Sequence, residues 1–189
     1  MFIQTEATPN PATLKFIPGT VVLGHGTADF PTPDSASVSP LAARIFSVPG
    51  VTNVFFGPDF ASVTKTDDVN WDAIKPAILG VIMEHYQAGR PVMNDGAESP
   101  GQSGHADHDG EDAEVVSQII ELLDSRVRPA VAQDGGDITF HGFDRGVVYL
   151  HMQGACAGCP SSTITLKMGI ENLLRHYIPE VTEVRPVAA

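Results

Sequence analysis

Short apolar runs and two helical segments alternate in the first half of this chain and outline a small α+β domain. The runs FIQTEA and ATLKFIP flank the turn TPNP, and VTNVFFG and FASVTKT flank Pro58–Asp59, so four β-strands are expected. The segments SPLAARIFSVPG and roughly Trp71 to Gln87 are expected to be helices, which gives the order β-β-α-β-β-α. Pro76 lies early in the longer helix and is expected to kink it or to mark its start.

The second half of the chain also has segments with helical spacing and segments that alternate like strands, but they follow in a different order. A helix is predicted over EVVSQIIELLDSRVRPAVAQ, where apolar residues have helical spacing, and the turn Asp134–Asp137 with its two glycines is expected to close it. The runs DITFHGF and GVVYLHMQG alternate and are joined through DRG, which predicts a β-hairpin. PSSTITLKMGIENLLRHYI predicts a second helix, with the apolar residues from Leu166 to Tyr177 on one face, and EVTEVRPV a last strand. The order is α-β-β-α-β, so the predicted fold class is α+β, with two small α+β domains.

A strongly acidic segment separates the two halves. Residues 94–112 carry six acidic side chains and no Lys or Arg, in a chain whose formal net charge is −12. This segment has no apolar side chain larger than Ala or Pro, so it cannot bury enough surface to offset the entropy cost of ordering. We therefore expect an N-terminal domain over 1–93, a flexible acidic linker over 94–112 and a C-terminal domain over 113–189.

Composition and charge exclude several classes of function. Phosphate binding needs a basic face, and none is visible in a chain with 23 acidic and 11 basic residues, so no nucleic-acid partner is expected. No window approaches the length of apolar sequence that spans a membrane. The first residues lack the features of a secretory signal or an organelle transit peptide, so a cytoplasmic location is expected.

The chain has two cysteines, Cys156 and Cys159, in the stretch GACAGCPSSTITLKM. Gly154 and Gly158 allow the backbone to turn sharply there, and Pro160 suits the first position of the following helix. The cysteines are either ordinary buried residues, a thiol–disulfide redox pair, or ligands of a metal site. A redox pair of the thioredoxin type requires a βαβ unit, whereas the strand before Cys156 is predicted to belong to an antiparallel hairpin.

A metal site requires more ligands than one chain offers. Structural zinc and most iron–sulfur clusters take four protein ligands, and thiolates suit both. Two copies of the chain that meet across a two-fold axis would supply Cys156 and Cys159 twice. The N-terminus of the following helix, with Ser161 and Ser162 in its first turn, is expected to lower the thiol pKa and to stabilise an anionic centre. The residues alone predict a shared, exposed thiolate site and do not choose between zinc and an iron–sulfur cluster.

The motifs around this site closely resemble those of a known family. RPAVAQDGGDITF and GACAGCPSSTITLKMGIENLLR resemble the C-terminal domain of NifU-like (Nfu-type) iron–sulfur cluster proteins, and MFIQTEATPNPATLKFIPG resembles the N-terminal domain of the two-domain members. The resemblance implies a scaffold or carrier that holds a [4Fe–4S] cluster between two subunits and transfers it to apo-proteins. It implies Cys156 and Cys159 as the cluster ligands. Four thiolates serve a [2Fe–2S] cluster equally well, so the cluster type is left open.

These expectations describe a carrier and not an enzyme. No catalytic residue is expected, and the sequence has no nucleotide-binding loop of the G-x-x-x-x-G-K-[ST] kind. The expected partners are a second copy of the chain, apo iron–sulfur acceptors and cluster-assembly proteins. The N-terminal domain has no catalytic or metal-ligand spacing and is interpreted as a binding module for such partners. A thiol–disulfide oxidoreductase and a zinc-bridged structural dimer are the alternatives.

Overall fold

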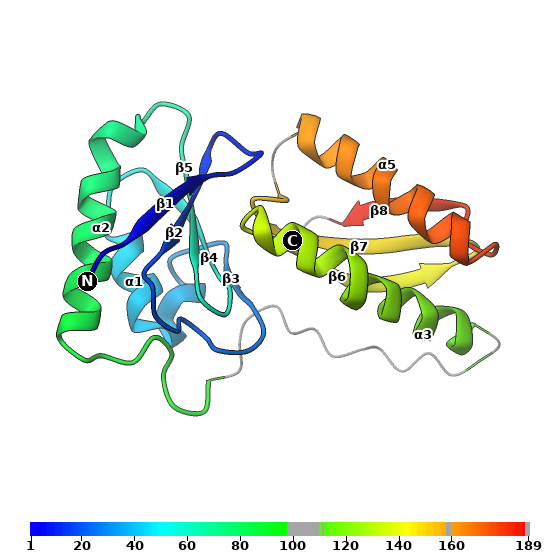
Figure 1. Ribbon diagram of the computed structural model, residues 1–189, viewed down its shortest axis with the longest axis horizontal. Coiled ribbons are helices and arrows are strands. Elements are labelled where there is room, and N and C mark those ends of the chain that lie inside the picture. Colours follow the sequence, from blue (N-terminus) through cyan, green and yellow to red (C-terminus); the bar gives the residue numbers. More distant parts are fainter. Residues whose placement is uncertain (98–109, 111, 158–159, 188–189) are drawn as a thin grey trace. The chain divides into compact units, whose positions relative to one another are not determined.

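The protein consists of two units, each with its own sheet and its own hydrophobic core (Figure 1). The computed structural model describes residues 1–97, 110, 112–157 and 160–187. The division between the units falls between residues 102 and 103. Both units combine helices with a sheet, so the predicted class of two α+β domains is confirmed.

The predicted linker, 94–112, is described only in part. Residues 98–109 and 111 lie outside the described residues, so the flexibility expected there stays a prediction. The first residue of this segment is bound to the N-terminal unit, because Asn94 N donates a hydrogen bond to Val38 O at 2.9 Å. The domain boundaries given by the sequence likewise stay predictions.

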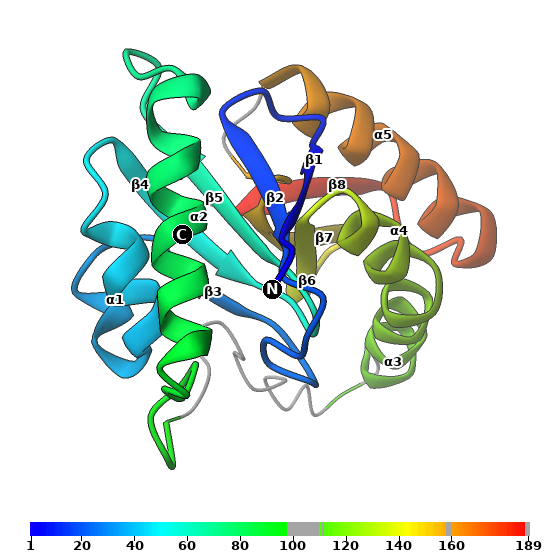
Figure 2. The same ribbon diagram turned by 60° about the vertical axis from the view of Figure 1, so that its left-hand side comes forward.

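The N-terminal unit is a five-stranded sheet with two helices on one face (Figure 2). The strands lie in the order β1-β2-β5-β4-β3, and each neighbouring pair is antiparallel. The elements are β1 (Gln4–Ala7), β2 (Thr13–Ile17), β3 (Ala28–Phe30), the 3-10 helix η1 (Ser35–Val38), α1 (Pro40–Phe46), β4 (Val51–Phe56), β5 (Ala61–Lys65) and α2 (Trp71–Gln87). The sequence did not predict β3 and η1, because each is too short to show a period.

Capping residues explain where the two helices of this unit begin. Ser39 Oγ accepts a hydrogen bond from Ala42 N at 3.1 Å and so satisfies one of the free N–H groups at the start of α1. Asn70 caps α2 in the same way. Helix α2 begins at Trp71 and continues through Pro76, so Pro76 does not mark its start.

A fully buried histidine, His85, makes the stability of the N-terminal unit depend on pH. His85 Nε2 lies 3.0 Å from the carbonyl oxygen of Pro91, to which it donates, and Nδ1 has no hydrogen-bond partner in the described part of the chain. Protonation would add a second N–H that has no acceptor. Burial lowers the pKa of His85 from its ordinary value of 6.5.

We expect the free energy of unfolding of this unit to decrease as the pH falls below about 6.5. The unfolded chain protonates at His85 before the folded chain does, so acid favours unfolding, and the full contribution of this group is present only above the unfolded pKa. Urea unfolding followed by the fluorescence of Trp71, the single tryptophan, measures this unit. The variant His85→Gln should unfold with a weaker dependence on pH, and an unchanged dependence would contradict the assignment.

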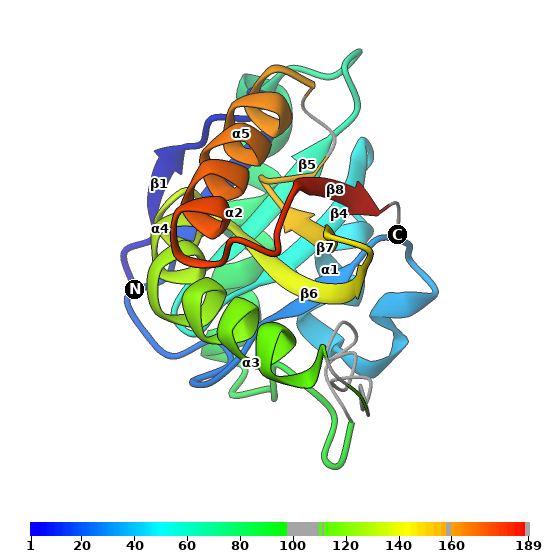
Figure 3. The same cartoon turned by 90° about the vertical axis from the view of Figure 1, so that its right-hand side faces the viewer.

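The C-terminal unit is a three-stranded mixed sheet with its helices on one face (Figure 3). Strands β6 and β7 are antiparallel, and β8 runs parallel to β7. The elements are α3 (Ala113–Leu122), the π-helical segment η2 (Leu123–Val127), α4 (Arg128–Gln133), β6 (Gly136–Asp144), β7 (Val147–Gly154), α5 (Pro160–Tyr177) and β8 (Glu183–Val187). The predicted order α-β-β-α-β is confirmed, with α3, η2 and α4 in place of the first helix.

The π-helical segment has a cause in the sequence. Pro129 has no N–H, and in a regular α-helix its ring would meet the carbonyl group of Ser125. The wider turn of η2 moves that carbonyl away, and the Ser125 hydroxyl donates to Glu121 O at 2.7 Å. The helical segment thus stays continuous through a residue that would otherwise end it.

The hairpin of β6 and β7 has the predicted turn and one irregularity. Arg145 and Gly146 have φ angles of 49° and 83°, as a two-residue type I′ turn requires. A bulge at His141 interrupts the alternation, and beyond it Phe143 is opposite Val148. Phe140 and Phe143 are three residues apart, so simple alternation would place them on opposite faces of the strand. Because of the bulge, both pack against the core.

Helix α5 joins β7 to its parallel neighbour β8, so these three elements form a βαβ unit. Ile170 and Leu174 are buried in the core, as predicted, but Tyr177 is 47% exposed, so its predicted place on the buried face is wrong. The Tyr177 ring instead lies 5.2 Å from the guanidinium of Arg126. In the described ranges, the protein has no helix long and apolar enough for a membrane span.

Candidate functional site

The bend that carries Cys156 follows directly from the end of β7. Gly154 has a φ of 61°, a conformation that favours glycine, and it turns the chain away from the sheet. Three backbone hydrogen bonds then hold the bend: Ala155 N to Gly135 O at 3.2 Å, Cys156 N to Gln153 O at 3.3 Å, and Ala157 N to Gly154 O at 3.1 Å. The bend is therefore tied both to its own strand and to the turn before β6.

Cys156 is buried in the C-terminal core. Its side chain is 6% exposed and belongs to the same apolar cluster as Ile138 and Met152. Burial, and then the negative charges of Asp137 and Asp134, raise the pKa of the Cys156 thiol to about 12. The prediction of an exposed thiolate with a lowered pKa is wrong for Cys156, because the core and two carboxylates outweigh the nearby helix end.

Cys159 and Gly158 lie outside the described residues, so the assignment of Cys156 and Cys159 as paired ligands stays a prediction. Helix α5 begins at Pro160, as predicted. Ser161 and Ser162 are in its first turn, and their side chains are outside the described part of the structure.

The D-G-G-D turn and the C-x-x-C bend meet in space. Asp134 ends α4, Gly135 follows with a φ of 80°, and Gly136 is paired with Gly154 across the hairpin. A Cβ atom on Gly136 would lie 2.5 Å from the Sγ atom of Cys156. The predicted turn is present, and its second glycine also makes room for the cysteine side chain.

The last residue of this turn is a buried carboxylate that pairs with a half-buried arginine. Arg128 Nε and Nη2 donate to the two carboxylate oxygens of Asp137 at 2.9 and 2.8 Å, and Asp137 Oδ1 also accepts from Ile138 N. The Asp137 carboxylate is 3% exposed. The pair and a contact with Asp124 raise the pKa of Arg128 further above its ordinary value. Sequence reasoning missed this pair, although an Arg and an Asp at the two ends of the RPAVAQDGGD motif were its visible signal.

Several buried polar atoms beside the bend have no partner in the described chain. They are Thr139 Oγ1, His151 Nε2 and both amide atoms of Gln153. Thr139 is opposite His151 in the hairpin, and Gln153 is the residue before Gly154. Buried polar atoms without partners are rare in native proteins. This end of the hairpin is thus the part of the described C-terminal unit where hydrogen bonding is least complete.

A methyl group at Gly136 should therefore disturb Cys156 without altering its chemistry. We expect Gly136→Ala to lower the free energy of unfolding by about 1–3 kcal/mol, as overpacking does, and to make Cys156 more accessible. Urea unfolding and the rate of alkylation at Cys156, followed by mass spectrometry, measure the two effects.

Gly142→Ala is the matched control for this change, because Gly142 is on the same strand and nothing lies within 4 Å of its added Cβ. Equal stability and equal alkylation rates in the two variants would contradict the steric role of Gly136.

No complete metal site is found within one copy of the described chain. Among the described residues, no group of three or more His, Cys, Asp and Glu side chains is placed to hold a metal ion. Zinc and cubane clusters usually take four protein ligands. A metal centre at Cys156 would therefore need ligands from outside these residues.

The structure gives one argument for a thiol–disulfide redox pair at Cys156 and one against it. The strand before Cys156 belongs to a βαβ unit as well as to the antiparallel hairpin, so the topological argument against a thioredoxin-like pair no longer holds. However, the thiolate is the nucleophile in disulfide exchange, and the pKa of Cys156 is raised to about 12. While Cys156 stays in the core, this leaves little thiolate at neutral pH.

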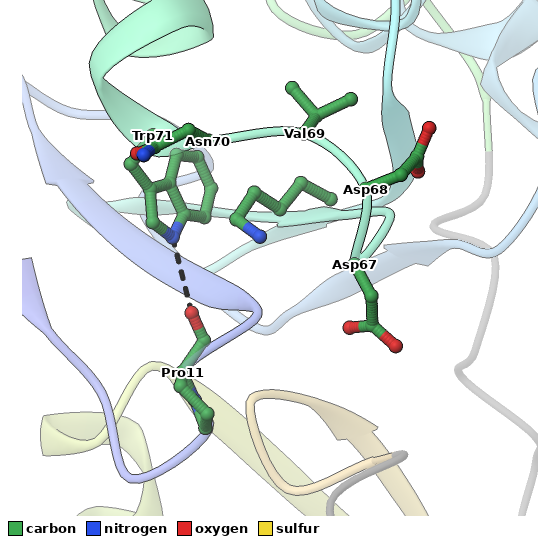
Figure 4. A pocket seen from close by; sticks show the side chains of 7 residues that line it. Pro11, Asp67, Asp68, Val69, Asn70 and Trp71 are labelled. Carbon is green, nitrogen blue, oxygen red and sulfur yellow. Dashed lines mark hydrogen bonds between the residues drawn. The ribbon is translucent and has the colours of Figure 1, made fainter.

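The N-terminal unit has a shallow pocket of about 440 Å³ at the start of α2 (Figure 4). Trp71 forms one wall, and its Nε1 donates to Pro11 O at 3.1 Å. Asp67 and Asp68 also line the pocket, but Figure 4 shows their carboxylates pointing in different directions. The pocket thus presents no convergent set of acids that would hold a cation.

Both units match known family models. The model described as scaffold protein Nfu/NifU N terminal matches residues 3–89, and the NifU-like domain model matches residues 119–185.

Curated relatives match over nearly the whole chain. NifU-like protein 4, mitochondrial, from Arabidopsis thaliana is 53% identical over 186 residues, which are 97% of this chain and 65% of that protein. The NFU1 iron-sulfur cluster scaffold homolog, mitochondrial, from Homo sapiens is 53% identical over 188 residues, or 99% and 72% of the two chains. The chain thus spans about two thirds of the length of such relatives. A solution NMR structure of a NifU-like protein from Saccharomyces cerevisiae is 28% identical, with a TM-score of 0.41, over 50% of this chain and 86% of that one.

The names of these relatives correct one prediction from the sequence. They are mitochondrial proteins, which contradicts the plain cytoplasmic location expected above. That expectation rested on the composition of the first residues. It was unsound, because the chain covers 65% of the Arabidopsis relative and its beginning carries no information on targeting.

Proposed function

This chain belongs to the NifU-like (Nfu-type) protein family, and we propose that it is a scaffold or carrier that binds an iron–sulfur cluster and passes it to apo-proteins. The main support is that the two motifs which carry the resemblance, the D-G-G-D turn and the C-x-x-C bend, meet at Gly136 and Cys156. The human relative is named an iron-sulfur cluster scaffold homolog. The proposed cargo is a [4Fe–4S] cluster, with [2Fe–2S] as the alternative that the same thiolates would serve.

The proposed ligands are Cys156 and Cys159 from each of two copies of the chain. Thiolates are the ligands that iron–sulfur clusters prefer, so the donor type fits this cargo. Within the described residues of one chain, no group of three candidate ligands supplies an alternative. Sharing across a two-fold axis would complete the set of four.

Cluster binding requires a change at Cys156, because its side chain is buried against Gly136 in the structure. The bend must turn the thiol outward, and the thiol must lose its proton as the Fe–S bond forms. Transfer would then proceed by ligand exchange. An acceptor thiol gives up its proton and forms a bond to iron, and the displaced Cys156 thiolate takes up a proton and returns to the core.

The N-terminal unit is proposed to bind acceptors or cluster-assembly proteins. Its pocket beside Trp71 has no convergent set of acids, and no catalytic residue is needed for ligand exchange. The proposed activity is therefore that of a carrier and not of an enzyme.

Anaerobic reconstitution of the full chain with iron and sulfide, in parallel with zinc alone, tests the proposal. We expect a broad brown absorbance and stoichiometric iron in the first sample. Zinc bound tightly in place of iron would support a zinc-bridged dimer instead. Reduction of insulin disulfides by a chain that binds no iron would support the oxidoreductase.

A further inference from the structure

The sulfur of Cys156 lies in a small space beside the Cα atom of Gly136, which we call the Gly136 seat. A Cβ atom at Gly136 would lie 2.5 Å from Cys156 Sγ and 2.9 Å from both Cys156 N and Gln153 O. Unlike Gly135 and Gly154, Gly136 does not have a left-handed φ, so its backbone conformation does not require glycine. The side chain is therefore missing only for the room that Cys156 occupies.

The hydrogen bonds that hold the bend in the seat are longer than usual. Cys156 N donates to Gln153 O at 3.3 Å, and Thr163 Oγ1 donates to Cys156 O at 3.3 Å. Typical distances are about 2.9 Å for an N–H donor and about 2.7 Å for a hydroxyl donor. Gly154, with a φ of 61°, begins the bend. The bend can therefore leave the seat without breaking a strong interaction.

The seated position and the cluster-bound position of Cys156 exclude each other. An iron atom has to lie against the sulfur together with its other ligands, whereas the seated side chain is 6% exposed and belongs to an apolar cluster with Ile138 and Met152. The seat thus competes with iron for Cys156. Whatever stabilises the seated position weakens cluster binding by the same factor, because both positions belong to one equilibrium.

We propose that Gly136 is a positioning residue for cluster release, because its seat takes Cys156 back from iron. The inference rests on the proposed function. In one exchange step an acceptor thiol loses its proton to solvent and its sulfur bonds to iron, while the bond from iron to Cys156 Sγ breaks. The Cys156 thiolate takes up a proton and enters the seat, and no electron is transferred. A seated thiol does not rebind iron, so the step proceeds towards the acceptor.

The size of the thiol sets the size of the effect. Burial of a group as large as one methylene shifts an equilibrium by about fourfold. A chain whose seat is filled should therefore release its cluster more slowly by a similar factor. Damage to the fold has the opposite sign, because a loosened site loses its cluster faster. The direction of the change thus separates a positioning role of Gly136 from a merely structural one.

The main test compares Gly136→Ala with Gly142→Ala in the full chain. Gly142 is on the same strand, and a Cβ atom added there meets nothing within 4 Å. The wild type and both variants are loaded anaerobically with iron and sulfide, and their iron content is measured. Excess benzenethiol is then added as the acceptor, and the loss of cluster absorbance is followed. Gly136→Ala should load fully and lose its cluster about fourfold more slowly, and Gly142→Ala should match the wild type.

Thr163→Val loosens the seated bend without filling the seat, so it carries the test if Gly136→Ala does not fold. Valine keeps the shape of threonine and removes the hydroxyl that donates to Cys156 O. Cluster release should slow by about twofold. In the chain without a cluster, alkylation of Cys156, measured by mass spectrometry, should be faster in both seat variants than in the wild type. This second measurement does not depend on iron.

Each outcome decides between the proposals. A wild-type chain that takes up no iron overturns the proposed function itself. If the wild type loads but the seat variants release their cluster as fast as the wild type, or faster, Gly136 has no positioning role and the scaffold proposal stands. If Cys156 is alkylated at the same rate in the wild type and the seat variants, the seat is not occupied in solution and the inference is wrong.

Discussion

The variant Cys156→Ser is expected to lose cluster binding altogether and to be less stable than the wild type. Serine offers no thiolate, and its hydroxyl would be buried in a cluster of apolar side chains where Cys156 is 6% exposed. A buried hydroxyl without a hydrogen-bond partner costs about 1–3 kcal/mol. Iron analysis after anaerobic reconstitution measures the first effect, and urea unfolding of the C-terminal unit measures the second.

Cys156→Ala separates the two effects, because it removes the thiolate without burying a polar group. We expect no cluster in this variant and a smaller loss of stability than in Cys156→Ser. Stoichiometric iron in either variant would show that Cys156 is not a ligand.

Arg128→Ala is expected to cause the largest loss of stability, about 3–5 kcal/mol in the C-terminal unit. The change leaves the Asp137 carboxylate, which is 3% exposed, without the two charged hydrogen bonds that now hold it. Asp137 is the second residue of β6 and follows Gly136, which lies against Cys156, so the bend should also lose its support. Chemical denaturation measured by far-ultraviolet circular dichroism, with hydrogen exchange of the β6 amides, reports on this unit.

Arg175→Ala is the control, since Arg175 pairs with Glu171 at 3.9 Å on the exposed side of α5. Such pairs contribute about 0.3–0.5 kcal/mol. The double variant Arg128→Met, Asp137→Leu should recover much of the lost stability, because it removes the buried carboxylate together with its partner. If Arg128→Ala lowers the free energy of unfolding no more than Arg175→Ala does, Asp137 is solvated in solution and the prediction is wrong.

The sequence alone predicted the elements whose periodicity is long enough to recognise. Helix α2 spans Trp71–Gln87, as expected from its segment, and the β6–β7 hairpin has its predicted turn at Arg145–Gly146. Strand β3 has three residues, all buried, and no alternation to detect. Its pairing with β4 is a tertiary contact that local sequence does not determine.

The bend that carries Cys156 was also predictable, but its environment was not. The glycines around Cys156 identified a bend before a helix, and α5 begins at Pro160 as expected. The burial of Cys156 depends on Gly136, which is 20 residues away in the sequence and adjacent only across the hairpin. The Arg128–Asp137 pair likewise forms only because the turn folds α4 back against β6.

The central claim is that two copies of the chain share one cluster through their C-x-x-C bends. Analytical ultracentrifugation of the anaerobically reconstituted full chain, with iron counted in the same fraction, tests it most directly. The account predicts a cluster-bearing species with twice the 20.0 kDa mass of one chain and about four irons per dimer. It also predicts that a chelator returns this species to single chains. A brown species that sediments with the mass of one chain would contradict it.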